Sequence, residues 1–107
     1  MTVTEAMSAA TALLPEGKKW LRRSTTTLDT EIVQTAASAF LDMKNAGIKR
    51  LDRNDPLIQQ AVKLYLKAHF GYDDQPEKWE AAYERLKAAL SLSSDYTTER
   101  EADHGEN

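Results

Sequence analysis

The sequence predicts an all-α fold, and three observations support that prediction. Helix-forming residues (Ala, Leu, Lys, Glu and Gln) dominate the composition. Several stretches place apolar residues every three or four positions, which is the period of an amphipathic helix. The three prolines, at positions 15, 56 and 76, each stand where a helix could begin. We expect one domain, a small bundle with one or two short N-terminal helices and a flexible C-terminal tail. Its three main helices are expected at about 27–46, 55–70 and 76–91.

The composition also excludes several classes of function. The chain has no cysteine, which rules out disulfides, thiolate catalysis and cysteine-ligated metals. A formal charge of −3 is too small to indicate a polyanion as partner. No stretch approaches the roughly 20 apolar residues of a membrane span. The first residues lack the basic segment of a signal peptide, and Glu5, Ser8 and Thr11 interrupt their apolar character. We therefore expect a soluble, intracellular protein that does not contact a membrane.

Residues 2–14 are expected to form a short helix. Thr2 and Glu5 have the spacing of a capping box, in which each residue satisfies a backbone N–H of the other. The apolar face of this helix would consist of Val3, Met7, Ala10 and Leu14. At this length the helix is marginal on its own, so it must dock against the rest of the protein or fray.

A second short helix is expected to begin near Pro15. Four cations then surround the apolar residues Trp20 and Leu21 in the segment 18–23; they are Lys18, Lys19, Arg22 and Arg23. Residues 24–27 are all serine or threonine and would form a polar linker.

The helix at about 27–46 has signals at both ends. Thr26 and Asp29 are a candidate capping box, and Gly47 is a natural stop. The buried stripe would consist of Leu28, Ile32, Val33, Ala36, Ala39, Phe40 and Met43. In the charged loop 48–54 that follows, we expect Ile48 and Leu51 to lie under the core.

The helix at 55–70 should be the centre of the fold, with the other helices packed around it. Asp55 can cap its start, Pro56 suits the first helical position, and Gly71 can end it. The apolar face would consist of Leu57, Ile58, Ala61, Val62, Leu64, Tyr65 and Ala68.

The last helix is expected to begin at Pro76 after a tight connection, with Asp74 or Gln75 as its cap. Its buried face would consist of Trp79, Tyr83, Leu86 and Leu90. Residues 91–96 are expected to be extended or turning. In residues 97–107 the only apolar side chain is Ala102, so we expect a flexible acidic tail.

The sequence offers little for catalysis or metal binding. His69 has no partner histidine except His104 in the predicted tail, so it is interpreted as a structural residue at the end of a helix. Asp73, Asp74, Glu77 and Glu80 lack the alternating spacing and central glycine of a calcium loop, which favours helix capping. We therefore expect no enzyme activity, no metal and no cofactor.

Two basic segments, 18–23 and 44–53, could contact phosphate. The last helix, however, mixes three cations with three carboxylates, whereas a helix that reads the major groove carries more positive charge. Sequence-specific DNA binding is therefore not expected. A small helical DNA-binding or packaging-accessory module that uses these two segments stays open as an alternative function.

One series of short stretches stands out between Leu21 and Tyr96. In order, these are residues 21–22, 25–32, 55–58, 65, 67–74, 83, 86 and 90–96. The pattern resembles the head–tail connector (adaptor) proteins of long-tailed phages, a family also labelled phage DNA-packaging proteins. The runs 67–74 and 90–96 are its most specific parts.

The resemblance implies an all-α subunit that assembles as a ring of about twelve copies beneath the portal protein. The ring would extend the DNA channel, join head to tail and present a surface to a tail-completion or stopper protein. DNA would pass through without sequence-specific binding. The location implied is the head–tail junction of the virion, after assembly in the cytoplasm of the bacterial host. The family brings no catalytic residue, metal or cofactor.

On this basis residues 15–96 are the expected connector domain, preceded by an extension, 1–14, and followed by the tail, 97–107. Two features depart from the family pattern: residues 1–14 precede its usual start, and Arg23 stands where members commonly have an apolar residue. In the family the C-terminal segment often grips the portal, so the tail could become ordered only in the assembled particle. We expect a subunit or portal interface formed by Lys18, Lys19, Trp20, Leu21, Arg22 and Arg23 with Glu77, Glu80 and Glu84 of a neighbour, and by Tyr96.

Overall fold

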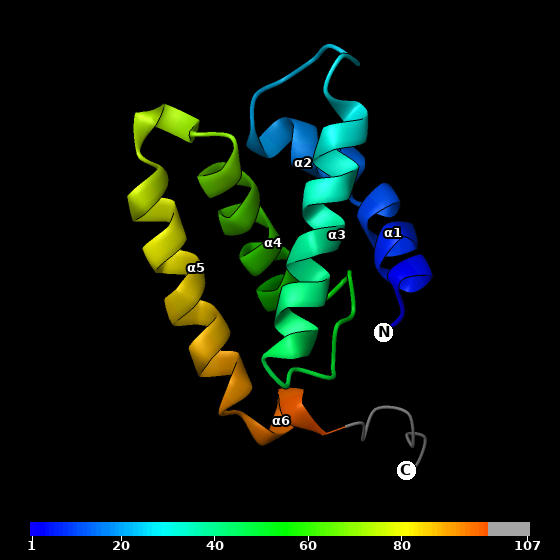
Figure 1. Cartoon of the computed structure of the whole chain (residues 1–107), viewed down its shortest axis with the longest axis vertical. Helices are drawn as coiled ribbons and strands as arrows, with labels where there is room; N and C mark the ends of the chain where they lie inside the picture. Colours follow the sequence, from blue (N-terminus) through cyan, green and yellow to red (C-terminus); the bar gives the residue numbers. More distant parts are fainter. Residues whose placement is uncertain (99–107) are drawn as a thin grey trace.

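The computed structural model describes residues 1–98, and all regular structure in this part of the chain is helical (Figure 1). This confirms the predicted all-α class. The elements are α1 (Val3–Ala12), α2 (Leu14–Trp20), α3 (Asp29–Asn45), α4 (Pro56–His69), a 3₁₀ turn η1 (Tyr72–Asp74), α5 (Pro76–Ser91) and α6 (Ser94–Thr97). None of the helices in residues 1–98 has the length and apolar content needed to cross a bilayer.

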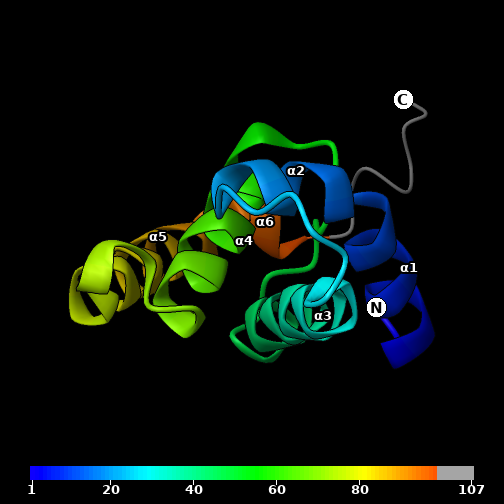
Figure 2. The same ribbon diagram turned by 90° about the horizontal axis from the view of Figure 1, so that it is seen from above.

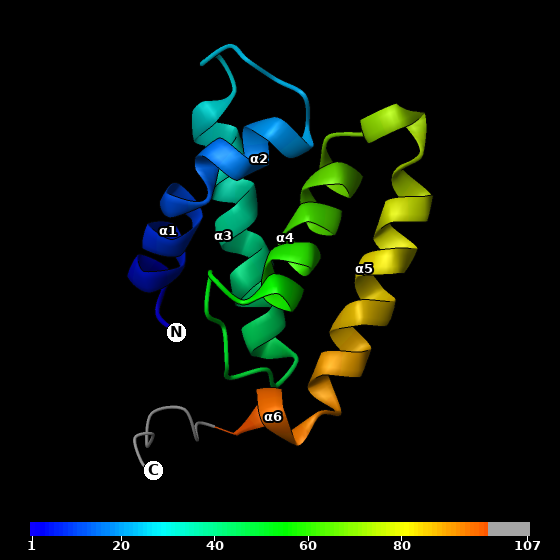
Figure 3. The same cartoon turned by 180° about the vertical axis from the view of Figure 1, so that it is seen from behind.

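The long helices α3, α4 and α5 lie side by side, and α4 packs against both of the others. Seen from above, α5, α4, α3 and α1 follow one another across the molecule (Figure 2). The short helix α2 crosses α3 and α4 on the face seen from behind (Figure 3). The helix predicted to be central, α4, therefore contacts α2, α3 and α5, whereas α1 packs mainly on α3.

Helix α4 begins as predicted, and Ile58, Ala61, Val62 and Leu64 of the expected stripe are buried, but the centre of its buried face is rotated. Asp55 caps it, because its Oδ1 accepts the backbone N–H groups of Leu57 at 2.8 Å and Ile58 at 3.4 Å. Leu57 was expected in the core but is 44% exposed, whereas Leu66 is 1% exposed. These two residues are nine positions apart, which at about 100° per residue places them on opposite sides of the helix. Contact with α2 explains the rotation, because Leu66 packs beside Gly17.

Helix α1 has the predicted capping box, but its buried face agrees only in part with the prediction. Thr2 Oγ1 accepts from the Glu5 N–H at 3.1 Å, and the Thr2 N–H donates to Glu5 Oε1 at 2.8 Å. Val3 and Met7 were expected to be buried, but they are 64% and 36% exposed. Ala10 is buried as predicted, and the other buried residues of this face are Ala6, Ala9 and Leu13. Three of these four are alanines, which let the backbone of α1 approach α3 closely, so closeness of packing outweighs side-chain size here.

One prediction about a helix start was wrong. Helix α3 begins at Asp29 without a side-chain cap, so Thr26 and Asp29 form no capping box. The Asp29 carboxylate instead pairs with Lys18 Nζ at 3.0 Å. Helix α5 begins at Pro76 with Gln75 in the cap position, as predicted, although the Gln75 side chain makes no capping hydrogen bond.

The glycine stops were correct. Gly47 has φ 98° and Gly71 has φ 62°, the left-handed conformation expected just past a helix end. Asp73 and Asp74 also have positive φ, 57° and 55°, so they form a strained turn between α4 and α5 and cap no helix. In the loop after α3, Ile48 is fully buried, as predicted.

The C-terminal part is more helical than expected. Residues 91–96 were predicted to be extended or turning, but α5 continues to Ser91 and a one-turn helix, α6, follows. The hydroxyl of Thr97 bonds to the carbonyl of Ser93 at 3.0 Å, which holds this turn closed. The predicted flexible tail lies outside the described residues from position 99 onward.

The close approach of α2 to the bundle depends on Gly17. A Cβ at this position would lie 3.2 Å from Ile32 Cγ2 and 3.4 Å from Leu66 Cδ1. We predict that Gly17→Val destabilises the fold by about 1–3 kcal/mol, because branched methyl groups would force α2 away from α3 and α4. Urea unfolding measures this change. Gly17→Ala is the control and should cost less, since a helical alanine regains about 1 kcal/mol of propensity; equal losses in both variants would contradict the packing argument.

Candidate functional site

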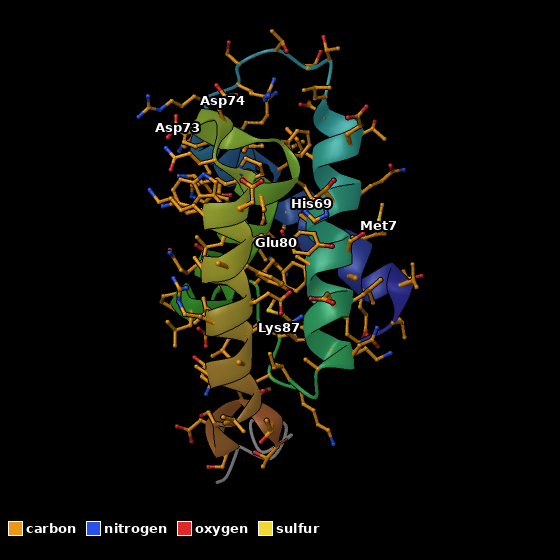
Figure 4. The ribbon with its side chains drawn as sticks, turned by 60° about the vertical axis from the view of Figure 1, so that its left-hand side comes forward. Met7, His69, Asp73, Asp74, Glu80 and Lys87 are labelled. Atoms are coloured by element: carbon orange, nitrogen blue, oxygen red, sulfur yellow. The ribbon has the colours of Figure 1, made fainter. Side chains whose placement is uncertain are left out.

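A hollow of about 350 Å³ lies between α3, α4 and α5. We call it the acidic groove, and its lining consists of Asp42, Tyr65, Ala68, His69, Glu80, Tyr83 and Glu84. Figure 4 shows His69, Glu80 and Lys87 between the ribbons of α3 and α5. Three carboxylates line the groove and give it negative charge.

Asp42 organises the polar contacts of the acidic groove. Its Oδ2 accepts the Tyr83 hydroxyl at 2.6 Å and Lys87 Nζ at 2.8 Å. Lys87 also pairs with Glu84 at 3.1 Å. Burial raises the pKa of Asp42, but the hydrogen bonds from Lys87 and Tyr83 outweigh burial and hold the pKa below its usual value. Burial, together with the hydrogen bond to Asp42, raises the pKa of Tyr83 far above its usual value.

His69 is the last residue of α4, which agrees with its interpretation as a residue at the end of a helix. Its ring stacks on Tyr65 with centroids 4.2 Å apart, and its Nδ1 lies 3.1 Å from the Tyr65 carbonyl oxygen. No group of three or more His, Cys, Asp or Glu side chains within residues 1–98 is placed to hold a metal ion. The other histidine, His104, lies outside the described residues.

A cluster of cations forms on α4, on α5 and in the segment after α2, and sequence reasoning missed it. We call it the basic patch; it consists of Arg22, Lys63, Lys67 and Lys78. Lys67 Nζ lies 4.3 Å from the ring centroid of Tyr72 and 4.6 Å from that of Trp79. Burial, the charges of the other three cations and an opposing contribution from Asp73 combine to lower the pKa of Lys67. The available signal was the four-residue spacing of Lys63 and Lys67 on the polar side of α4.

The residues of the predicted basic segment 18–23 have different surroundings in the structure, and only some of them are exposed. Lys18 is paired with Asp29, and Leu21 is only 5% exposed, so both are engaged within the subunit. The guanidinium of Arg23 lies over the Phe70 ring, 5.7 Å from its centroid, and Trp20 is half-buried against the core. The exposed members are Lys19, Arg22 and Arg23. Their predicted acidic counterparts, Glu77, Glu80 and Glu84, are exposed on α5, and no ion pair joins the two sets within residues 1–98.

Tyr96, another predicted interface residue, is bound within the subunit. Its hydroxyl donates to both carboxylate oxygens of Asp55, at 2.9 and 3.1 Å. Its carbonyl oxygen accepts the backbone N–H groups of Lys49 at 2.7 Å and Arg50 at 3.1 Å. The Arg50 guanidinium lies 5.6 Å from the centre of the Tyr96 ring. These contacts fasten α6 to the start of α4.

An exposed apolar side chain of α1 borders a second, smaller hollow. Met7 lines it together with Asp29, Thr30 and Val33 of α3, and its volume is about 270 Å³. Val3, one turn earlier on α1, is exposed as well. This side of α1 therefore presents apolar surface to the outside of the subunit.

Comparison with known proteins gave one positive result. A family model described as phage connector protein matches residues 13–97. The matched segment begins at the end of α1 and contains α2 to α6, together with the acidic groove and the basic patch. Neither the curated proteins nor the solved structures include a match to the chain.

The hydrogen bonds to Asp42 lead to a prediction about pH. Because the pKa of Asp42 is lowered in the folded state, this carboxylate contributes stability above its unfolded pKa of about 3.9. That contribution is lost as the pH falls through the folded-state pKa. We expect Asp42→Asn to destabilise the protein by about 1 kcal/mol at neutral pH and by progressively less below about pH 4.

Urea unfolding between neutral and acidic pH measures this difference. Glu31→Gln, an exposed carboxylate on the same helix, is the control and should change little at any pH. A deficit of Asp42→Asn that is the same at acidic and neutral pH would contradict the assignment.

The contact between Tyr96 and Asp55 gives a second prediction. Tyr96→Phe keeps the ring over Arg50 but removes the hydroxyl, and hydrogen bonds to charged groups are typically worth about 1.5–3 kcal/mol. We expect faster hydrogen exchange at the amides of Lys49 and Arg50, which donate to the Tyr96 carbonyl. Tyr72→Phe removes a hydroxyl elsewhere and should leave these amides protected. Unchanged exchange in Tyr96→Phe would show that the hydroxyl does not hold α6 in place.

Proposed function

The chain belongs to the phage connector protein family, and we propose that it is the subunit of a head–tail connector. The family is a structural one, so the protein is a structural component of the phage virion. In our proposal, copies of the subunit assemble as a ring under the portal protein, extend the DNA channel and join head to tail.

The observation that supports this proposal is the extent of the family match. Residues 13–97 contain every helix after α1, so the match includes the whole α2–α6 body of the subunit. The acidic groove and the basic patch offer polar surface for contacts between proteins, which is the work of a connector.

A ring requires each subunit to offer different surfaces to its left and right neighbours. We propose that the exposed cations Lys19 and Arg22, with the half-buried Trp20, contribute to one of these surfaces. The carboxylates of Glu77, Glu80 and Glu84 on α5 would contribute to the other. The exposed residues Val3 and Met7 of α1 are a further candidate for contact with a neighbour or with the portal.

The proposed partners are other copies of the chain, about twelve in the particle, the portal protein and a tail-completion or stopper protein. DNA would pass through the ring without sequence-specific contact. The protein would assemble in the host cytoplasm and end at the head–tail junction.

The alternative DNA-binding module would use segments 18–23 and 44–53, where several cations are already engaged. Lys18 is paired with Asp29, and Arg50 lies 3.9 Å from Asp55. Lys49, Arg50 and Arg53 line a hollow of about 650 Å³ that also contains the carboxylates of Glu5 and Asp52. Phosphate would compete with these carboxylates, so we favour the connector.

We predict that the purified protein co-migrates with the portal protein encoded in the same genome, at about one copy per portal subunit. Light scattering coupled to size-exclusion chromatography gives the mass of the complex. A gel shift with random duplex DNA across a range of salt concentrations is the parallel measurement for the alternative. Salt-sensitive DNA binding without association with the portal would overturn the connector proposal and favour the DNA-binding module.

A further inference from the structure

The layer formed by α4 and α5 carries opposite charges on its two faces. On α4, Lys63 and Lys67 each precede a residue of the acidic groove, Tyr65 and His69, by two positions. On α5, Lys78 precedes Glu80 by two positions. Two positions are about 200° of helix rotation, so each lysine points away from the groove residue that follows it. The same two helices therefore present residues of the acidic groove on one face and the three lysines of the basic patch on the other.

Both faces are only partly neutralised within the described part of the subunit. The side chain of Glu80 has no hydrogen-bond or ion-pair partner among residues 1–98, and Lys87 is the one cation that bonds to the groove carboxylates Asp42 and Glu84 there. None of the four cations of the basic patch forms an ion pair with a carboxylate in this part of the chain. Each face thus keeps excess charge, which a partner of opposite sign would neutralise.

The basic patch is also held in place before any partner arrives. The Tyr72 and Trp79 rings meet edge to face at 6.0 Å, and the Trp79 indole N–H donates to the Tyr72 carbonyl at 3.0 Å. Lys67 lies against both rings, and Lys78 Nζ lies 4.8 Å from the Trp79 ring centroid. Cation–π contacts of this kind restrict otherwise flexible side chains, which lowers the entropy cost of binding.

We infer that the basic patch of one subunit docks against the acidic groove of the next copy of this chain. The inference rests on the proposed ring and identifies the surfaces that would form it. The occupant is a second copy because the chain itself supplies both charges, on opposite faces of one layer. A contact between two different faces is heterologous, so each copy can bind one neighbour on each side and the series can close.

Charge reversal in two variants tests the inference. The first, Lys63→Glu with Lys78→Glu, makes both faces acidic; the second, Glu80→Lys with Glu84→Lys, makes both faces basic. Lys67 and Asp42 stay unchanged because they support neighbouring side chains. Copies of either variant alone should repel one another. At low salt we expect at least tenfold fewer portal-bound copies than for the unchanged protein. An equimolar mixture should restore assembly, because every acidic face then meets a basic one.

Two controls separate a specific contact from general attraction between charges. Lys44→Glu with Lys49→Glu has the same net charge as the first variant and should assemble like the unchanged protein. Glu16→Lys with Glu31→Lys has the same net charge as the second variant and should fail to rescue the first one. Circular dichroism establishes that every variant is folded. Two results would overturn the inference. One is normal assembly of the first or the second variant alone; the other is failure of their equimolar mixture to assemble although both are folded.

Cross-linking keeps the inference testable if the portal proposal fails. The chain has no cysteine, so Lys63→Cys and Glu80→Cys introduce the only thiols. With a short bismaleimide, concentrated protein carrying both substitutions should give a ladder of multimers, and a mixture of the two single variants should stop at dimers. A ladder without portal binding would retain the contact and reject the connector, whereas portal binding without a ladder would retain the connector and reject this contact.

Discussion

The carboxylate of Asp55 is the contact on which the arrangement of the bundle depends. It is 9% exposed, and it satisfies the first N–H groups of α4 while accepting the Tyr96 hydroxyl. One side chain thus fixes where the central helix begins and where the C-terminal turn is attached. The Tyr96 carbonyl in turn holds the backbone of the loop before α4. Since a buried carboxylate is stable only when its hydrogen bonds are made, these contacts form together or are lost together.

How much the sequence could predict depended on whether a signal was local. The capping box of Thr2 and Glu5, the cap at Asp55 and the glycine stops involve neighbours in the chain, and they were predicted correctly. Val3 and Met7 were wrongly assigned to the buried face of α1, because apolar periodicity gives large side chains more weight than the alanines that fit against α3. Leu66 was missed because its burial depends on the crossing of α2 at Gly17, which no periodicity reveals.

The candidate surfaces show the same division. Glu80 and Glu84 were identified from their positions on one helix, but the hydrogen bonds that join Asp42 to Tyr83 and Lys87 span more than forty residues of sequence. The basic patch unites residues from three segments, and only its α4 pair has a spacing visible in the sequence. The internal hydrogen bonds of Tyr96 to Asp55, 41 residues away in the chain, likewise have no signal in the sequence, and its proposed role at an interface stays a prediction.

A contact between subunits built on charge differs physically from one built on apolar surface. Charged surfaces speed encounter and select the correct partner and orientation, but in water they add little net affinity per pair. Copies that meet through the groove and the patch would therefore associate weakly when free. Binding to a symmetric template raises their effective concentration and converts weak contacts into stable ones without new interactions. A two-residue offset on α4 and α5 would then be enough to give a small acidic subunit two complementary faces, and assembly would be favoured where a template holds the copies side by side.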